Sequence, residues 1–188
     1  VVLLHGRGSN EADIIGLADH LPSGAAYAAV RAPISEGGGY AWFANRGIGR
    51  PLADSLRSTM DWFRAWLDEV APAGRPVLLV GFSGGAAFAG GLVLDDPSRY
   101  AGAAVLYGTL PFDAGLPTDP GRLANLPVFV AQGDGDHVIP PRAALPELDL
   151  PTVRVRCTHG RAAATGRRPP RPPPRREPGR AGRGPGTP

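Results

Sequence analysis

Short runs of wholly apolar residues alternate with helical segments along this chain, and this alternation restricts its fold more than any other feature. Such runs lie at residues 1–4, 77–80, 103–106 and 128–131. Strands that are apolar on both faces are typical of a parallel sheet covered on each side. Strands that alternate with helices predict such a sheet. We therefore expect an α/β fold, with a mostly parallel sheet and helices on both faces.

The clearest helix is predicted over residues 53–70. Apolar residues recur there at helical spacing, which gives a helix one buried face; they are Leu56, Met60, Phe63, Leu67 and Val70. Trp62 and Trp66 widen this face, and we expect both in the core. Further helices are predicted over residues 84–96 and from Glu11 to Leu21, the second capped by Ser9 or Asn10. The glycine-rich stretch 31–52 is predicted to be an irregular loop.

Charge divides the chain into two parts. The whole sequence has a formal net charge of +3, but residues 1–150 carry −6 and residues 151–188 carry +9. From Cys157 onward the sequence has no Val, Ile, Leu, Met, Phe, Tyr or Trp, so this segment has nothing with which to join a core. We expect a folded domain over residues 1–156 and a disordered Arg/Pro/Gly-rich tail over 157–188. A shifted reading frame in a GC-rich gene would also produce such a tail.

The cysteine content and the length of the apolar runs bear on disulfides, metal binding and membrane insertion. Cys157 is the only cysteine, which excludes an intramolecular disulfide, and no paired metal ligands accompany it. No apolar run reaches the roughly 18 residues of a membrane helix. The chain begins at Val1 inside a predicted strand, so we expect it to be truncated at its N-terminus. We expect a cytoplasmic protein without metal or cofactor, and the oligomeric state stays open.

Ser83 is the first candidate for chemistry. The segment Gly81-Phe82-Ser83-Gly84-Gly85 fits G-x-S-x-G and lies between a predicted strand and a predicted helix, as the nucleophile elbow of serine hydrolases does. Small neighbours allow a tight turn that lifts the serine hydroxyl above the sheet, and the following helix directs its positive end to the site. The alternative is that Ser83 is only a small residue in a sharp turn.

An acidic loop follows the strand at 126–132. Its sequence GDGDHVIP places Asp134 and Asp136 at the carboxyl end of that strand, where ligands bind in sheets of this type. A serine nucleophile needs a base, and the base needs an orienting carboxylate. Asp136 suits this role, and Asp134 is expected to accept bonds from loop amides. The alternative is that both aspartates only shape a turn.

The three motifs LLHGRGSN, GFSGG and GDGDHVIP, in this order and at these intervals, resemble the phospholipase/carboxylesterase family of α/β-hydrolases, which includes acyl-protein thioesterases and small bacterial esterases. The resemblance covers about residues 1–155. It implies that Ser83 is the nucleophile and Asp136 the acid of a catalytic triad. It also implies an oxyanion hole formed by the backbone N–H groups of Arg7 and Gly84, with His5 as a structural residue.

The catalytic base of this triad has to be one of the remaining histidines. His20 is expected to be solvated. His137 directly follows Asp136, and because adjacent loop residues usually point apart, the side chains of Asp136 and His137 should not bond to each other. His159 follows the last predicted strand, at residues 152–156, where the family has its histidine. It is only 23 residues from Asp136, however, and the Gly-His motif and closing helix of the family are absent. His159 is either the base or a sign that the base is missing.

These observations predict a serine hydrolase that cleaves carboxylic esters or thioesters through an acyl-enzyme. A weak strand is predicted over residues 25–30. Trp42 and Phe43, in the loop after it, are expected either to line the acyl pocket or to anchor that loop in the core. The alternative function is a hydrolase-fold protein that is catalytically impaired because it lacks a proper histidine. The arginine-rich tail also suits an acidic or nucleic-acid surface, but we expect no nucleic-acid binding by the folded domain.

Overall fold

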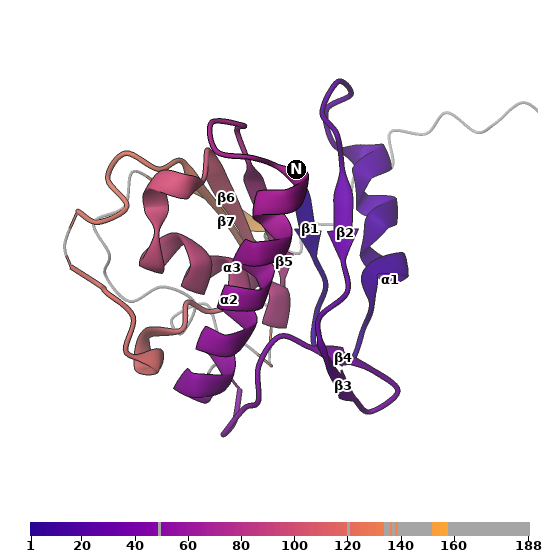
Figure 1. The fold of residues 1–188 in the computed structure, drawn as a ribbon, viewed down its shortest axis with the longest axis vertical. Helices are drawn as coiled ribbons and strands as arrows, with labels where there is room; N and C mark the ends of the chain where they lie inside the picture. The colour runs from indigo at the N-terminus through magenta and orange to yellow at the C-terminus, as the bar shows by residue number, and fades with distance from the viewer. Residues whose placement is uncertain (49, 120, 134–135, 137, 139–151, 158–188) are drawn as a thin grey trace, which may run out of the picture.

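A six-stranded parallel sheet forms the centre of the molecule in this computed structural model (Figure 1). The structure describes residues 1–48, 50–119, 121–133, 136 and 138 and, as backbone, 152–157. The sheet has the strand order β2-β1-β5-β6-β7-β8, and each neighbouring pair is parallel. The predicted α/β class and parallel sheet are therefore confirmed.

The helices and strands follow one another much as the apolar pattern predicts. In chain order they are β1 (Val2–Leu4), α1 (Glu11–Ile15), β2 (Ala28–Val30), β3 (Ile34–Glu36), β4 (Gly39–Ala41), α2 (Ala53–Val70), β5 (Leu78–Phe82), α3 (Gly84–Asp95), β6 (Gly102–Leu106), β7 (Val128–Gly133) and β8 (Thr152–Cys157). None of the helices in the described part of the chain is long and apolar enough to cross a membrane.

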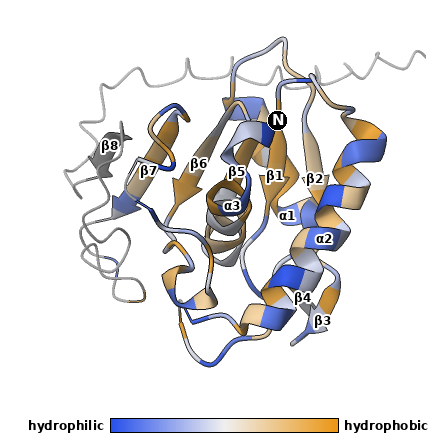
Figure 2. Ribbon diagram, turned by 60° about the vertical axis from the view of Figure 1, so that its left-hand side comes forward, coloured by the Kyte–Doolittle hydropathy of each residue, from blue (hydrophilic) through white to orange (hydrophobic). Residues whose placement is uncertain are grey.

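Apolar side chains fill both faces of the sheet because successive residues of a strand point to opposite sides. In β5, Leu79 packs in the larger core under α2 and α3, whereas Val80 packs in a smaller core with Ile14 of α1. Figure 2 shows α3 in front of strands that are hydrophobic along most of their length. The predicted helices therefore lie on both faces. On the α1 side, Leu78 and Phe129 are each still 38% exposed.

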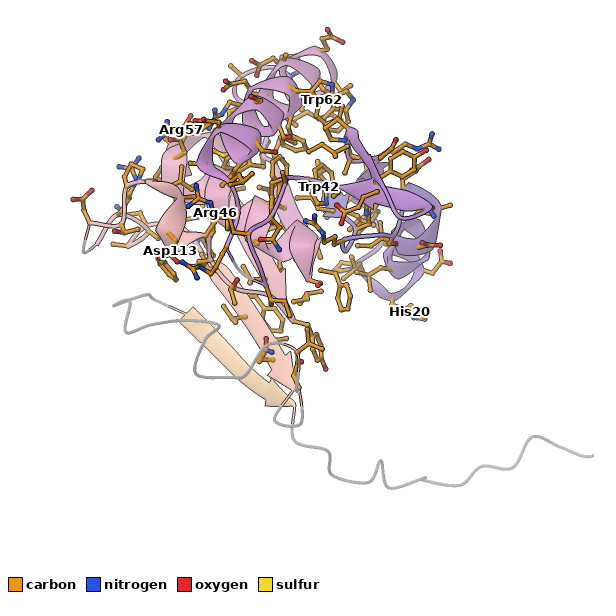
Figure 3. All side chains as sticks on the ribbon, turned by 90° about the horizontal axis from the view of Figure 1, so that it is seen from below. His20, Trp42, Arg46, Arg57, Trp62 and Asp113 are labelled. Carbon is orange, nitrogen blue, oxygen red and sulfur yellow. The ribbon has the colours of Figure 1, made fainter. Side chains whose placement is uncertain are left out.

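Helix α2 has the predicted bounds, but its buried face is narrower than predicted. Leu56, Met60, Phe63 and Leu67 are buried, whereas Trp62 is 40% and Val70 46% exposed. Trp62 lies about 100° around the helix from Phe63, outside the stripe that faces the sheet, and Val70 is the last residue of the helix. Figure 3 shows Trp62 at the outer side of α2, far from Trp42 at the middle of the molecule. The core assignment of Trp62 is wrong.

The first helix is shorter than predicted. The Asn10 side chain accepts hydrogen bonds from the N–H groups of Ala12 and Asp13, so Asn10 is the cap and Ser9 is not. The α-helix ends at Ile15 and continues as a 3₁₀ helix over Gly16–His20. Glycine is the poorest helix former after proline, which explains the change at this point.

The stretch predicted as one irregular loop contains the hairpin of β3 and β4. Ile34, Ser35 and Glu36 pair antiparallel with Ala41, Tyr40 and Gly39. Arg31 lies over the Tyr40 ring at 4.9 Å. Arg31 also bonds to Glu11 of α1, and this bond lowers the Glu11 pKa to about 2. The hairpin is therefore a defined element at one end of the sheet, visible below β1 and β2 in Figure 1.

Candidate active site

Ser83 lies at the junction of β5 and α3 in a backbone conformation that residues with a side chain rarely adopt. Its φ is 53° and its ψ is −114°, and such a conformation costs on the order of 1–3 kcal/mol. The Ser83 N–H donates to the carbonyl of Leu106 in β6 over 2.9 Å, which fixes the turn to the neighbouring strand. The positive end of α3 lies at the serine, because the helix begins at Gly84.

Two glycines make this turn possible, because the backbone packs around them more closely than a side chain permits. A Cβ on Gly81 would lie 2.3 Å from the carbonyl oxygen of Gly85, and a Cβ on Gly85 would lie 2.1 Å from the carbonyl oxygen of Leu4. Strands β1 and β5 and helix α3 therefore converge at Ser83. The glycines of the motif are therefore needed because a side chain at either position would collide with the backbone.

The loop after β1 packs against the same turn. A Cβ on Gly84 would lie 3.2 Å from the backbone nitrogen of Arg7, and a Cβ on Gly6 would lie 3.5 Å from the Cβ of Ser83. Gly84 is the first residue of α3, so its N–H has no acceptor within the helix. The backbone of Gly84 and the amide of Arg7 are therefore neighbours beside the serine. Two backbone amides beside the serine are the arrangement that the predicted oxyanion hole requires.

A cavity of about 190 Å³ adjoins Ser83. Its lining includes Arg7 and Gly84 as well as the side chains of Trp42 and Phe43. Both aromatic residues are also core residues, since Trp42 is 1% and Phe43 4% exposed. Trp42 and Phe43 therefore both line the cavity and anchor their loop in the core.

Trp42 is held by ring contacts and a hydrogen bond that fix the wall of this cavity. Its ring stacks on Phe88 of α3 at 4.6 Å between ring centroids. Its indole N–H donates to the backbone carbonyl of His5 over 2.8 Å. Through this bond the wall of the cavity is connected to the loop after β1.

We expect the substitution Trp42→Phe to lower the free energy of unfolding by about 2 kcal/mol, because it leaves the buried His5 carbonyl without its donor. Urea unfolding measures this change. The matched control is Trp62→Phe at the exposed position on α2, for which we expect a change of about 0.5 kcal/mol or less. Equal losses in both variants would contradict the role of the indole bond.

Asp136 follows β7 and has both of its carboxylate oxygens engaged. Oδ1 accepts from the N–H of Val138 over 2.8 Å, and Oδ2 accepts from the side-chain amide of Gln132 over 2.9 Å. Val138 also lines the cavity beside Ser83. The loop that carries Asp136 therefore reaches the same cavity as the serine, although the two residues are more than 50 positions apart in the sequence.

The described histidines differ in their hydrogen bonds and in their distance from the site. Nε2 of His5 accepts from the N–H of Ala32 over 3.1 Å, so the proton is on Nδ1, which donates to the carbonyl of Gly6 over 2.8 Å. Both ring nitrogens of this fully buried residue are therefore occupied. His20 lies at the end of the 3₁₀ helix, at the periphery of the molecule (Figure 3). Asp134, His137 and His159 lie outside the described residues.

Comparison with known proteins identifies the family. A model of the phospholipase/carboxylesterase family matches residues 1–145. The chain belongs to this family. A comparison with curated proteins found no match.

Solved structures support this family assignment. A carboxylesterase from Mesorhizobium loti is 27% identical with a TM-score of 0.65, and the match covers 73% of this chain and 66% of that one. Esterase PE8 is 26% identical with a TM-score of 0.68, over 85% and 82% of the two chains. The Bacillus cereus carboxylesterase, 24% identical over 85% and 79%, has a TM-score of 0.73 and supports the fold. The match thus spans slightly less than two thirds of the Mesorhizobium chain.

Several residues around the cavity have no counterpart in the sequence analysis. Ile48, Thr109 and Ala87 line it. Only one signal pointed to any of them: Thr109 follows an apolar strand, at the edge of the sheet where ligands bind. The position of Ile48 depends on a long loop, and no local pattern indicates it.

Proposed function

We propose that this protein is a serine esterase that cleaves carboxylic esters or thioesters, with Ser83 as its nucleophile. The observation that supports this most strongly is the strained turn at Ser83. Its φ of 53° is kept although glycine would adopt it without cost, and it lies beside a cavity at the N-terminus of α3. Strain of this kind is concentrated at functional sites.

In the proposed mechanism, Oγ of Ser83 attacks the carbonyl carbon of the ester while a base accepts the hydroxyl proton. His159 is the proposed base and Asp136 its orienting carboxylate. The amides of Arg7 and Gly84 stabilise the negative oxygen of the tetrahedral intermediate. The leaving alcohol or thiol departs with the proton from the base. Water then attacks the acyl-Ser83 ester in the same manner and releases the carboxylic acid.

The size of the cavity favours short acyl groups. Its volume of about 190 Å³ lies below the usual range of ligand-pocket volumes and suits an acyl chain of a few carbons. Its walls near the serine are the apolar side chains of Trp42, Phe43 and Ala87. We therefore propose p-nitrophenyl acetate and p-nitrophenyl butyrate as model substrates.

We expect Ala87→Leu to lower kcat/KM for p-nitrophenyl butyrate about tenfold and to change that for p-nitrophenyl acetate much less. The added side chain would fill part of the cavity, and a misfit of this size corresponds to roughly 1–3 kcal/mol. The ratio of the two rates in the same protein preparation is the measurement. An unchanged ratio would show that the acyl chain lies elsewhere.

The second candidate is a hydrolase-fold protein without esterase activity. It is favoured by one observation: within the described residues, His5 has both ring nitrogens bonded and His20 lies at the periphery. Steady-state hydrolysis of p-nitrophenyl butyrate by the intact chain distinguishes the two candidates. Hydrolysis above the rate of the Ser83→Ala variant supports the esterase. Equal rates from two proteins with the same circular dichroism spectrum favour the inactive fold.

A further inference from the structure

The loop that carries the amide of Arg7 is supported by the β3–β4 hairpin. The N–H of Gly8 donates to the carbonyl of Tyr40, and the N–H of Tyr40 donates to the carbonyl of Ser9, each over 2.9 Å. Gly39 allows this approach, because a Cβ there would lie 2.0 Å from the carbonyl oxygen of Gly8. Loop and hairpin are therefore in direct backbone contact, although about 30 residues separate them in the sequence.

The side chain of Arg7 adds bonds to two further residues, a bidentate pair with Glu36 among them. Its Nε donates to Oε1 of Glu36, the last residue of β3, over 2.8 Å. A terminal guanidinium nitrogen donates to the backbone carbonyl of Phe43 over 2.9 Å. Phe43 is a wall of the cavity beside Ser83. One planar guanidinium thus connects the loop after β1, the hairpin and the cavity wall.

We propose that Arg7 is a positioning residue, whose guanidinium holds its own backbone amide beside Gly84 and holds Phe43 at the acyl pocket. This inference rests on the proposed esterase function and extends it to the support of the oxyanion hole. A guanidinium serves this purpose because its donors have a fixed planar arrangement and bind two acceptors at once. A lysine ammonium has no such fork.

The Arg7–Glu36 ion pair is partly exposed, so its loss should affect positioning at the site more than the stability of the fold. The side chains of Arg7 and Glu36 are 33% and 41% exposed, and ion pairs with this exposure contribute little to the free energy of unfolding. A misplacement of about 1 Å near a reaction centre, however, lowers rates up to about a hundredfold. The proposal therefore predicts an effect on kcat without a comparable effect on stability.

The first test compares the kinetics of four variants on p-nitrophenyl butyrate. We expect kcat to fall about tenfold or more in Arg7→Ala, with KM changed less than threefold, and Arg7→Lys to recover less than half of this loss on a logarithmic scale. Glu36→Ala should lower kcat by a smaller factor. The matched control is Arg64→Ala, which removes an ion pair of similar exposure to Asp95 of α3 and a more exposed one to Asp61 of its own helix; its kcat should be unchanged.

The charge of the guanidinium is the competing explanation, because a positive charge also stabilises an oxyanion. In that case Arg7→Lys would restore the rate, and Glu36→Ala would raise it by removing the neighbouring negative charge. Either result would overturn the positioning role. A fall in thermal midpoint in Arg7→Ala that is much larger than in Arg64→Ala would also overturn it, since the effect would then be on the whole fold.

A second test does not depend on activity. Amide hydrogen exchange, followed by NMR, reports the opening of the Gly8 and Tyr40 bonds. We expect the exchange of both amides to be about tenfold faster or more in Arg7→Ala and unchanged in Arg64→Ala. Unchanged exchange in Arg7→Ala would refute the proposal. If the wild-type chain hydrolyses no ester, the proposed function fails, and the exchange rates still decide whether Arg7 holds the loop.

Discussion

Replacing Ser83 with alanine is expected to lower kcat for p-nitrophenyl butyrate by about 10⁴- to 10⁶-fold. The reason is that the nucleophile and its base act as a unit, so the loss of either removes almost all of the triad's contribution. Steady-state kinetics measures the change, and the rate of a protein-free sample sets the lower limit.

Ser83→Gly provides the matched variant for this experiment. It also lacks the hydroxyl and should be equally inactive, but glycine adopts a φ of 53° without strain. We therefore expect Ser83→Gly to be about 1 kcal/mol or more stable than Ser83→Ala in urea unfolding. Activity in either variant would refute Ser83 as the nucleophile, and equal stability would refute strain at this turn.

The substitution Gly85→Ala is expected to have the largest effect on stability. Its Cβ would lie 2.1 Å from the carbonyl oxygen of Leu4, and neither β1 nor α3 can move without disturbing the sheet. Overpacking against backbone atoms costs about 3 kcal/mol, a large part of the free energy of unfolding of an ordinary domain. Thermal and urea unfolding measure the loss.

Gly16→Ala is the control for Gly85→Ala. No heavy atom lies within 4 Å of a Cβ at Gly16, and its φ of −60° suits any residue. We expect this variant to be as stable as the wild type or up to about 1 kcal/mol more stable. A Gly85→Ala protein that unfolds at the same urea concentration as Gly16→Ala would show that β1 and α3 are not packed as described.

The order of strands and helices could be predicted because it depends on local patterns. Helix α2 has the predicted bounds since its apolar residues repeat at helical spacing over 18 residues. The β3–β4 hairpin was missed for the opposite reason. Each of its strands has only three residues, and no alternation is visible over so short a length. The hairpin is held partly by the loop after β1, a contact between distant segments that no local pattern contains.

The candidate site could be predicted in part for a similar reason. A short motif indicates Ser83, because the tight turn needs glycines at fixed positions around it. The role of the Arg7 side chain had no such signal, since Glu36 and Phe43 are brought to it only by the fold. Trp62 is exposed although tryptophan is a large apolar residue, because its angle around α2 puts it outside the stripe that faces the sheet. His159 and the tail over 157–188 stay predictions.

The most direct test of the central claim is covalent labelling of the intact chain with an alkyl phosphonofluoridate, followed by mass spectrometry of its peptides. Activated serine nucleophiles displace fluoride from such reagents and keep the phosphonyl group, which resembles the tetrahedral intermediate. The account predicts one phosphonyl group, on Oγ of Ser83, and no labelling of the Ser83→Gly variant. A folded wild-type chain that stays unlabelled, or a label on another residue, would contradict it.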